Sequence, residues 1–169
     1  MNFEWTPFAI PYMISGVMAV AVALVARRYR HRQGATALCC LVVAAAVWSL
    51  GNALETCSVG LEAKALWANI EYVGIVAVPV AWFAAALGLT GKNEWLNRRN
   101  IMILMVVPIA VQVLVWTNGY HGLMRYNVGI DTSGPFGVIV KTYGLGFWVM
   151  TVYSYVLLAI GTARIMKAV

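Results

Sequence analysis

Long apolar runs separated by short polar stretches dominate the chain. A helix needs about 20 apolar residues to cross the roughly 30 Å hydrocarbon core of a membrane. Runs close to this length occur at residues 7–26, 36–54, 65–89, 100–117 and 142–163. The pattern therefore predicts an all-α polytopic membrane protein with five transmembrane helices.

The polar segment between the fourth and fifth runs, residues 118–141, is long enough to hold structure of its own. Within it, residues 125–130 and 137–141 contain β-branched and aromatic side chains, and they flank the turn-forming residues 131–135. Two such stretches around a turn are typical of a β-hairpin. We therefore expect a short β-hairpin in this loop.

Basic residues fall unevenly on the two sides of the predicted membrane. Of the 12 Lys and Arg residues, nine follow the first, third and fifth runs, and only Lys64, Arg125 and Lys141 lie on the other side. Cytoplasmic loops carry the excess of Lys and Arg in membrane proteins. We therefore expect the N-terminus outside, the C-terminus inside and residues 118–141 in an outer loop.

Composition points to a membrane protein as well. The chain is 62% hydrophobic and 11% charged, whereas a soluble domain has roughly 45–50% apolar and about 25% charged residues. This excludes a water-soluble globule and makes the lipid bilayer the main partner. The net charge of +6 lies in short clusters between the spans and is interpreted as a topology signal, so we expect no nucleic-acid partner.

Catalytic motifs are missing from the sequence. It contains no glycine-rich phosphate loop and no nucleophile elbow, and its two histidines, His31 and His121, do not have metal-ligand spacing. We therefore expect no enzyme activity, no metal site and no cofactor within this chain.

A carboxyl group inside the third run is the main candidate for a functional site. Glu71 lies seven residues past Lys64, which places it on the order of 10 Å below the outer boundary of the span. A charged residue at that depth must be paired, protonated or in a water-filled cavity, and it marks a functional site by default. The alternative is that Glu71 lies closer to the interface and reaches the headgroups.

The neighbours of Glu71 suggest a ligand pocket. Candidate residues lie at similar depth on two neighbouring runs: Trp48, Asn52 and Glu55 on the second, and Trp67, Glu71 and Tyr72 on the third. Aromatic walls with a few convergent polar groups are typical of small-molecule sites. The alternative is an ordinary belt of interfacial aromatic residues.

Three further positions have both a functional and a structural interpretation. Pro79 and Pro108 lie inside predicted spans, where a proline kinks the helix and forms either a hinge or a static bend. His121 lies in the outer segment, where it is either a ligand contact or a structural residue.

The sequence resembles the N-terminal seven-transmembrane sensor region of histidine kinases, which is also found ahead of diguanylate-cyclase modules. The resemblance extends from about residue 34 to about residue 163. The residues that carry it are 47–55 (VWSLGNALE), 67–75 (WANIEYVGI), 79–82 (PVAW), 89–92 (LTGK), Pro108, 117–121 (TNGYH) and 153–155 (YSY).

The resemblance implies a membrane sensor that detects a small molecule or a membrane stimulus and passes the signal to a cytoplasmic output domain. It also implies a homodimer and the plasma membrane of a prokaryote. The positions that match the family's pattern are Trp48, Glu55, Trp67, Glu71, Tyr72, Pro79, Trp82, Asn118 and His121.

The chain departs from that family in having five predicted spans instead of seven. We therefore expect residues 1–169 to form a single membrane-embedded domain, either a fragment or a reduced form of a longer protein. The alternative function is a non-catalytic accessory subunit that packs within a larger membrane complex.

Overall fold

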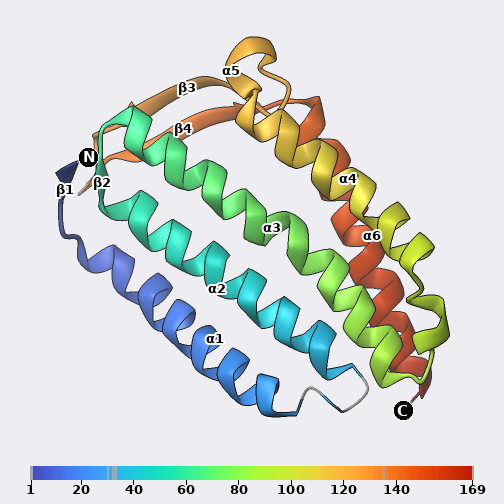
Figure 1. The fold of residues 1–169 in the computed structure, drawn as a ribbon. Helices are drawn as coiled ribbons and strands as arrows, with labels where there is room; N and C mark the ends of the chain where they lie inside the picture. The colour runs from blue at the N-terminus through green and yellow to red at the C-terminus, as the bar shows by residue number, and fades with distance from the viewer. Residues whose placement is uncertain (1, 30, 32–33, 135, 169) are drawn as a thin grey trace.

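Five long helices make up most of the structure, which is a computed structural model describing residues 2–29, 31, 34–134 and 136–168 (Figure 1). In the described residues these five are long and apolar enough to cross a membrane, which confirms the predicted mostly helical chain. They are α1 (Ile10–Arg28), α2 (Ala35–Cys57), α3 (Leu61–Leu89), α4 (Arg98–Trp116) and α6 (Leu145–Ala168). The short elements are β1 (Asn2–Phe3), β2 (Ser58–Val59), α5 (Asn118–His121), β3 (Arg125–Asp131), β4 (Val138–Tyr143) and the 3-10 turns Pro7–Ala9 and Asn93–Trp95.

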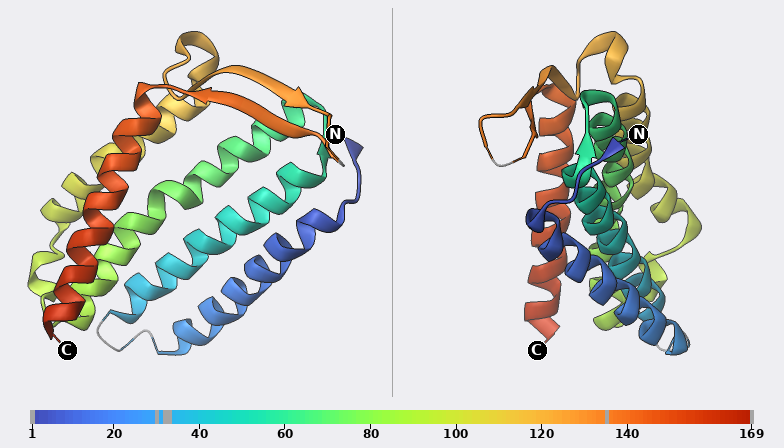
Figure 2. Two further views of the ribbon diagram at one scale, coloured as in Figure 1. Left: turned by 180° about the vertical axis from the view of Figure 1, so that it is seen from behind. Right: turned by 90° about the vertical axis from the view of Figure 1, so that its left-hand side faces the viewer.

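Helix α3 is the centre of the bundle. Helices α1, α2 and α3 lie side by side in one layer, and α4 and α6 pack on the far side of α3 (Figures 1 and 2). In its most apolar stretch α3 is 56% buried, compared with 17–22% for the other four helices. The outer helices therefore present most of their apolar surface outward, as helices in lipid do.

The helices extend beyond several of the predicted spans. Helix α2 continues to Cys57 and α3 already begins at Leu61, whereas the apolar runs end at 54 and start at 65. A helix satisfies its own backbone hydrogen bonds, so it can continue past the hydrocarbon core while its polar side chains lie at the interface. Gly60, with φ at 93°, permits the tight connection between the two helices.

Strands β3 and β4 form an antiparallel pair that crosses one end of the bundle. The pairing runs from Arg125 opposite Tyr143 to Asp131 opposite Val138, with an irregularity between Tyr126 and Gly129. This ribbon starts beside α4, passes over the ends of α3 and α2, and returns to α6 (Figures 1 and 2). It therefore covers the same end of the bundle as β1 and β2.

Glycine residues let α2 and α3 approach closely. A Cβ atom on Gly74 would lie 2.4 Å from the Ala44 carbonyl oxygen and 2.7 Å from the Trp48 nitrogen. At the C-terminal end of α3, a Cβ atom on Gly88 would lie 2.5 Å from Cα of Gly34, in the connection between α1 and α2. Small residues of this kind allow the backbones of membrane helices to come into contact.

We expect Gly74→Ala to lower the free energy of unfolding by about 1–3 kcal/mol, because the added methyl group overpacks the α2–α3 contact. Unfolding of the protein in mixed micelles with rising SDS, followed by circular dichroism, measures this change. Gly119→Ala is the control, because a Cβ atom there meets no other residue within 4 Å. Equal stability of the two variants would contradict the close α2–α3 packing.

Candidate functional site

A single cavity contains most of the side chains that the sequence suggested as ligand contacts. It has a volume of about 590 Å³ and lies between α2, α3 and α6, with β4 at one end. We call it the central cavity. Its lining includes the predicted residues Trp48, Asn52, Glu55, Glu71, Tyr72 and Pro79.

Glu71 is the most deeply buried acidic group of the central cavity, with only 5% of its surface exposed. Its Oε2 atom accepts a hydrogen bond of 3.0 Å from Nδ2 of Asn52. The other oxygen, Oε1, is buried without a hydrogen-bond partner in the described part of the chain. Gly51 makes room for this side chain, since a Cβ atom there would lie 2.6 Å from Cγ of Glu71.

The charges around Glu71 are mixed. The Glu55 carboxyl group is close enough to Glu71 both to repel it and to share a hydrogen bond with it, while Lys141 and Arg125 attract it. Lys141 comes from β4 and lines the central cavity, and its ammonium group lies 5.8 Å from the centre of the Tyr143 ring. The cavity therefore combines two carboxyl groups, one ammonium group and several aromatic side chains.

Arg125 connects β3 to the central helix. Its side chain is 7% exposed, and its Nη2 atom donates hydrogen bonds to Oδ1 of Asn69 and to the carbonyl oxygen of Ala65 on α3. Burial lowers the pKa of Arg125 below its ordinary value, and Tyr72 is the main group that opposes this shift. A guanidinium group keeps its proton in proteins, so a buried positive charge holds the ribbon against α3.

Asn118 fixes the backbone on either side of Arg125. Its Oδ1 atom accepts hydrogen bonds from the backbone nitrogens of Met124 (2.9 Å) and Arg125 (3.1 Å). Its Nδ2 atom donates to the carbonyl oxygen of Arg125 at 2.7 Å. One side chain at the start of α5 therefore sets the position at which β3 begins.

Two of the predicted ligand residues lie outside the central cavity. Trp67 does not line it, although its Nε1 atom is buried and has no partner among the described residues. The ring of His121 is bonded to the Thr117 hydroxyl group and to the backbone nitrogen of Leu123, both at 3.0 Å. The geometry of His121 therefore suits a structural residue that closes α5.

The two prolines that were considered as hinges differ in their surroundings. Pro79 is buried within α3 and lines the central cavity. Pro108 is fully buried within α4. Both helices continue through their proline, so each proline bends or loosens a helix without ending it.

The sequence analysis did not predict that Lys141 lines the central cavity, or that Arg125 is hydrogen-bonded to Asn69 on α3. Arg125 and Lys141 served there as orientation signals and as ends of the predicted strands. Neither basic residue is near Glu71 in sequence. The pairing of β3 with β4 and the hydrogen bonds of Arg125 to α3 bring them together.

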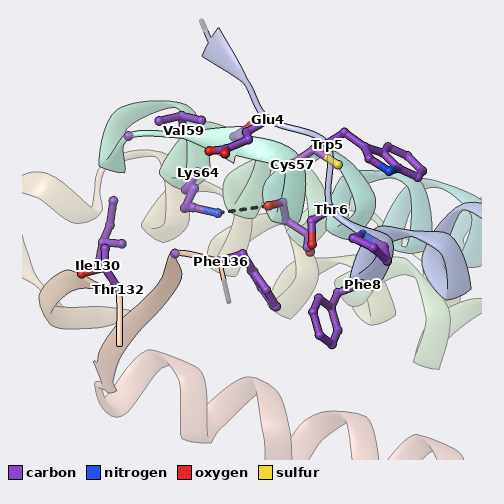
Figure 3. Close-up of a pocket in the computed structure, with 15 residues that line it drawn as sticks. Glu4, Trp5, Thr6, Phe8, Cys57, Val59, Lys64, Ile130, Thr132 and Phe136 are labelled. Carbon is purple, nitrogen blue, oxygen red and sulfur yellow. Dashed lines mark hydrogen bonds between the residues drawn. The ribbon is translucent and has the colours of Figure 1, made fainter. Parts of the chain in front are cut away.

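A second cavity, of about 560 Å³, lies between the N-terminal segment, the α2–α3 connection and the tip of the β3–β4 ribbon (Figure 3). Lys64 reaches into this region and donates hydrogen bonds to the carbonyl oxygens of Glu55 (2.8 Å) and Thr56 (3.4 Å), so it caps the end of α2. The rings of Phe8 and Phe136 meet at a centroid distance of 4.9 Å. The ribbon tip is therefore in contact with the start of α1.

The described residues contain no cluster of side chains that could bind a metal ion. Among residues 2–29, 31, 34–134 and 136–168, no three His, Cys, Asp or Glu side chains come together as they would around a metal ion.

Five apolar helices indicate a multi-pass membrane protein, and a cavity that contains several polar side chains lies near one end of the bundle. The family model of the N-terminal seven-transmembrane region of histidine kinase matches residues 11–169. The chain belongs to this family, as its sequence motifs predicted. No curated protein and no solved structure matches the chain.

Family membership assigns a general role to the chain. The seven-transmembrane region of these kinases is a non-catalytic sensor, the input domain of a signal-transduction protein. The described residues of this chain contain five of the long apolar helices.

We expect Asn118→Ala to loosen the start of β3, because it leaves two backbone N–H groups without their acceptor. Loss of such partners costs about 1–3 kcal/mol. Amide hydrogen exchange of residues 122–127, measured by mass spectrometry, should become about tenfold faster or more.

Asn97→Ala is the matched control, because Asn97 caps the opposite end of α4 through the Asn100 nitrogen. It should leave exchange at residues 122–127 unchanged. The same increase in both variants would mean that Asn118 has no specific role in the ribbon.

Proposed function

We propose that this chain is the membrane-embedded input domain of a two-component-type signalling protein and that its stimulus acts in the central cavity. The stimulus is a small molecule or a change in the membrane. One observation carries the proposal: Glu71 presents a buried carboxyl group to a cavity inside a membrane bundle, and its Oε1 atom accepts no hydrogen bond from a described N–H or hydroxyl group.

The cost of burying a carboxyl group supports a functional role for Glu71. A polar atom without a hydrogen bond in a low-dielectric environment is unfavourable by roughly 1–3 kcal/mol. Asn52 satisfies only one of the two oxygens. A ligand or a water molecule that donates a hydrogen bond to Oε1 would remove this penalty. The carboxyl group therefore favours binding of a hydrogen-bond donor in the cavity.

The elements around the central cavity also suit signal transmission. The cavity is lined by α6 and by Pro79, which lies in the middle of α3. A ligand shifts a conformational equilibrium only through its different affinities for the two states. Closing of the cavity around a stimulus would change how α6 sits on α3, with Pro79 and Pro108 as hinges.

We further propose that the N-terminus lies outside and the C-terminus inside the plasma membrane of a prokaryote. The two ends of the chain lie at opposite ends of the bundle (Figure 1), which supports an odd number of crossings. The Lys and Arg bias supports the direction. In this orientation the β3–β4 hairpin and the central cavity are on the outer side, and the domain acts as a homodimer or within a larger membrane complex.

The orientation predicts which loops react with a reagent outside the cell. In a background of C39A, C40A and C57A, a membrane-impermeant maleimide should label S133C on intact cells and E94C only after permeabilisation. Ser133 and Glu94 are both exposed and lie in connections at opposite ends of the bundle. The reverse labelling pattern would invert the proposed topology.

We expect Glu71→Gln to change signalling without affecting membrane insertion, because it replaces an oxygen of the buried carboxyl group with an amide nitrogen and keeps the side-chain volume. The measurement is the transcript profile of source cells that carry the variant, compared with the wild type and a deletion strain. The variant should depart from the wild type, in the direction of the deletion strain or opposite to it.

Glu62→Gln is the control, because Glu62 is an exposed acid in the first turn of the same helix. It should give the wild-type profile. If Glu71→Gln gives that profile too, at normal membrane levels and with a distinct deletion phenotype, the sensor site fails. An accessory subunit of a larger complex then becomes the better explanation.

A further inference from the structure

Lys141 is already positioned in the central cavity as a bound ammonium group would be. Its Nζ atom lies 5.8 Å from the centre of the Tyr143 ring, within the range in which a cation is attracted to an aromatic face. It also lies close enough to Glu71 to interact electrostatically with that side chain. Lys141 belongs to β4, a strand at one end of the bundle. Its ammonium group is therefore attached to the ribbon and not to a helix.

The side chains that line the central cavity suit a cation larger than the ammonium group of a lysine. Two carboxyl groups, Glu55 and Glu71, line the cavity, and Oε1 of Glu71 is unpaired. Aromatic side chains surround them: Trp48, Tyr72, Tyr143, Phe147 and Tyr155. Aromatic faces combined with carboxylates form the usual cage for quaternary and primary ammonium ligands.

An anionic ligand fits this cavity poorly. It would face both carboxyl groups, and its only cationic partner in the lining would be Lys141. Arg125, the other nearby cation, does not line the cavity and uses its Nη2 atom to hold α3. The arrangement therefore favours a positive ligand.

We propose that the central cavity binds an organic ammonium ligand and that Lys141 is an internal occupant which the ligand displaces. This inference rests on the proposed sensor function and names the ligand class of the same site. The ligand ammonium would take the position near Glu71 and the aromatic walls, and the Lys141 side chain would leave the cavity.

Displacement of Lys141 acts on α6 through a short and rigid connection. Lys141 is in β4, and α6 begins at Leu145. The corner between them is tightly packed, because a Cβ atom on Gly144 would lie 2.2 Å from the carbonyl oxygen of Leu123. The backbone nitrogens of Gly144 and Gly146 also donate to Met124 (3.1 Å) and Leu123 (2.9 Å). A movement of β4 would therefore also move the start of α6, because the connection between them has little freedom to change shape.

Choline and its neutral carbon analogue 3,3-dimethylbutan-1-ol test this inference with the wild-type chain in lipid nanodiscs. Isothermal titration should give binding of choline at least about tenfold tighter than of the neutral analogue, the difference expected for a desolvated cation–π site with a carboxylate. This comparison needs no variant. Equal affinities, or no choline binding, would overturn the proposal.

Two variants test the role of Lys141. Lys141→Met should tighten choline binding about fivefold or more, because it removes the internal competitor, whereas Glu71→Gln should weaken it about tenfold or more. Lys167→Met removes the same charge at the end of α6 and should have no effect. If Lys141→Met weakens choline binding, or if acetate binds through Lys141, the cavity is not an ammonium site.

The outcomes separate this inference from the sensor function. If choline fails to bind while Glu71→Gln still changes the transcript profile, the ligand class is wrong and the sensor site stands. If Glu71→Gln has no effect in cells, the sensor function itself fails, whatever the binding data give.

Discussion

The buried carboxyl group of Glu71 is the constraint on which the upper half of the bundle depends. A carboxyl group inside a membrane helix needs polar partners, space and countercharges. Asn52 supplies a hydrogen bond from α2, Gly51 supplies space, and Arg125 and Lys141 supply positive charge from the ribbon. Two helices and both strands are thus organised around one side chain.

The same arrangement explains the position of the ribbon. A two-stranded ribbon is marginally stable by itself, and here it is held at both ends. Arg125 binds α3 where β3 begins, and Phe136 contacts Phe8 near the tip. The ribbon therefore lies across the end of the bundle instead of extending into solvent, and it closes one end of the central cavity.

Local periodicity was enough to predict the helices and most of the side chains that line the cavity. It did not predict which face of α3 points toward the cavity. On α3 the cavity is lined by positions 68, 71, 72, 75, 78 and 79, a helical stripe that includes Glu71 and Tyr72. Trp67 and Gly74 belong to the neighbouring stripe, and Gly74 packs against α2. The rotation of α3 depends on glycine contacts with α2, which no pattern within α3 reveals. The basic residues were missed because strand pairing and long-range contacts bring them to Glu71.

A sensor needs a part that can move when the stimulus binds. In this chain the packing around the central cavity is uneven, which suits such a movement. The α2–α3 contact is tight because glycines bring the two backbones together, so these helices form a rigid wall on the N-terminal side of the proposed hinge at Pro79. The opposite wall is different: α6 lines the central cavity with an exposed aromatic side chain, Tyr155, and the cavity extends along this helix from Phe147 to Leu158. A stimulus that fills the space between a rigid wall and a looser one moves the looser one. Since α6 follows directly from β4, we expect a stimulus at the β4 end of the cavity to act on β4 and α6 together.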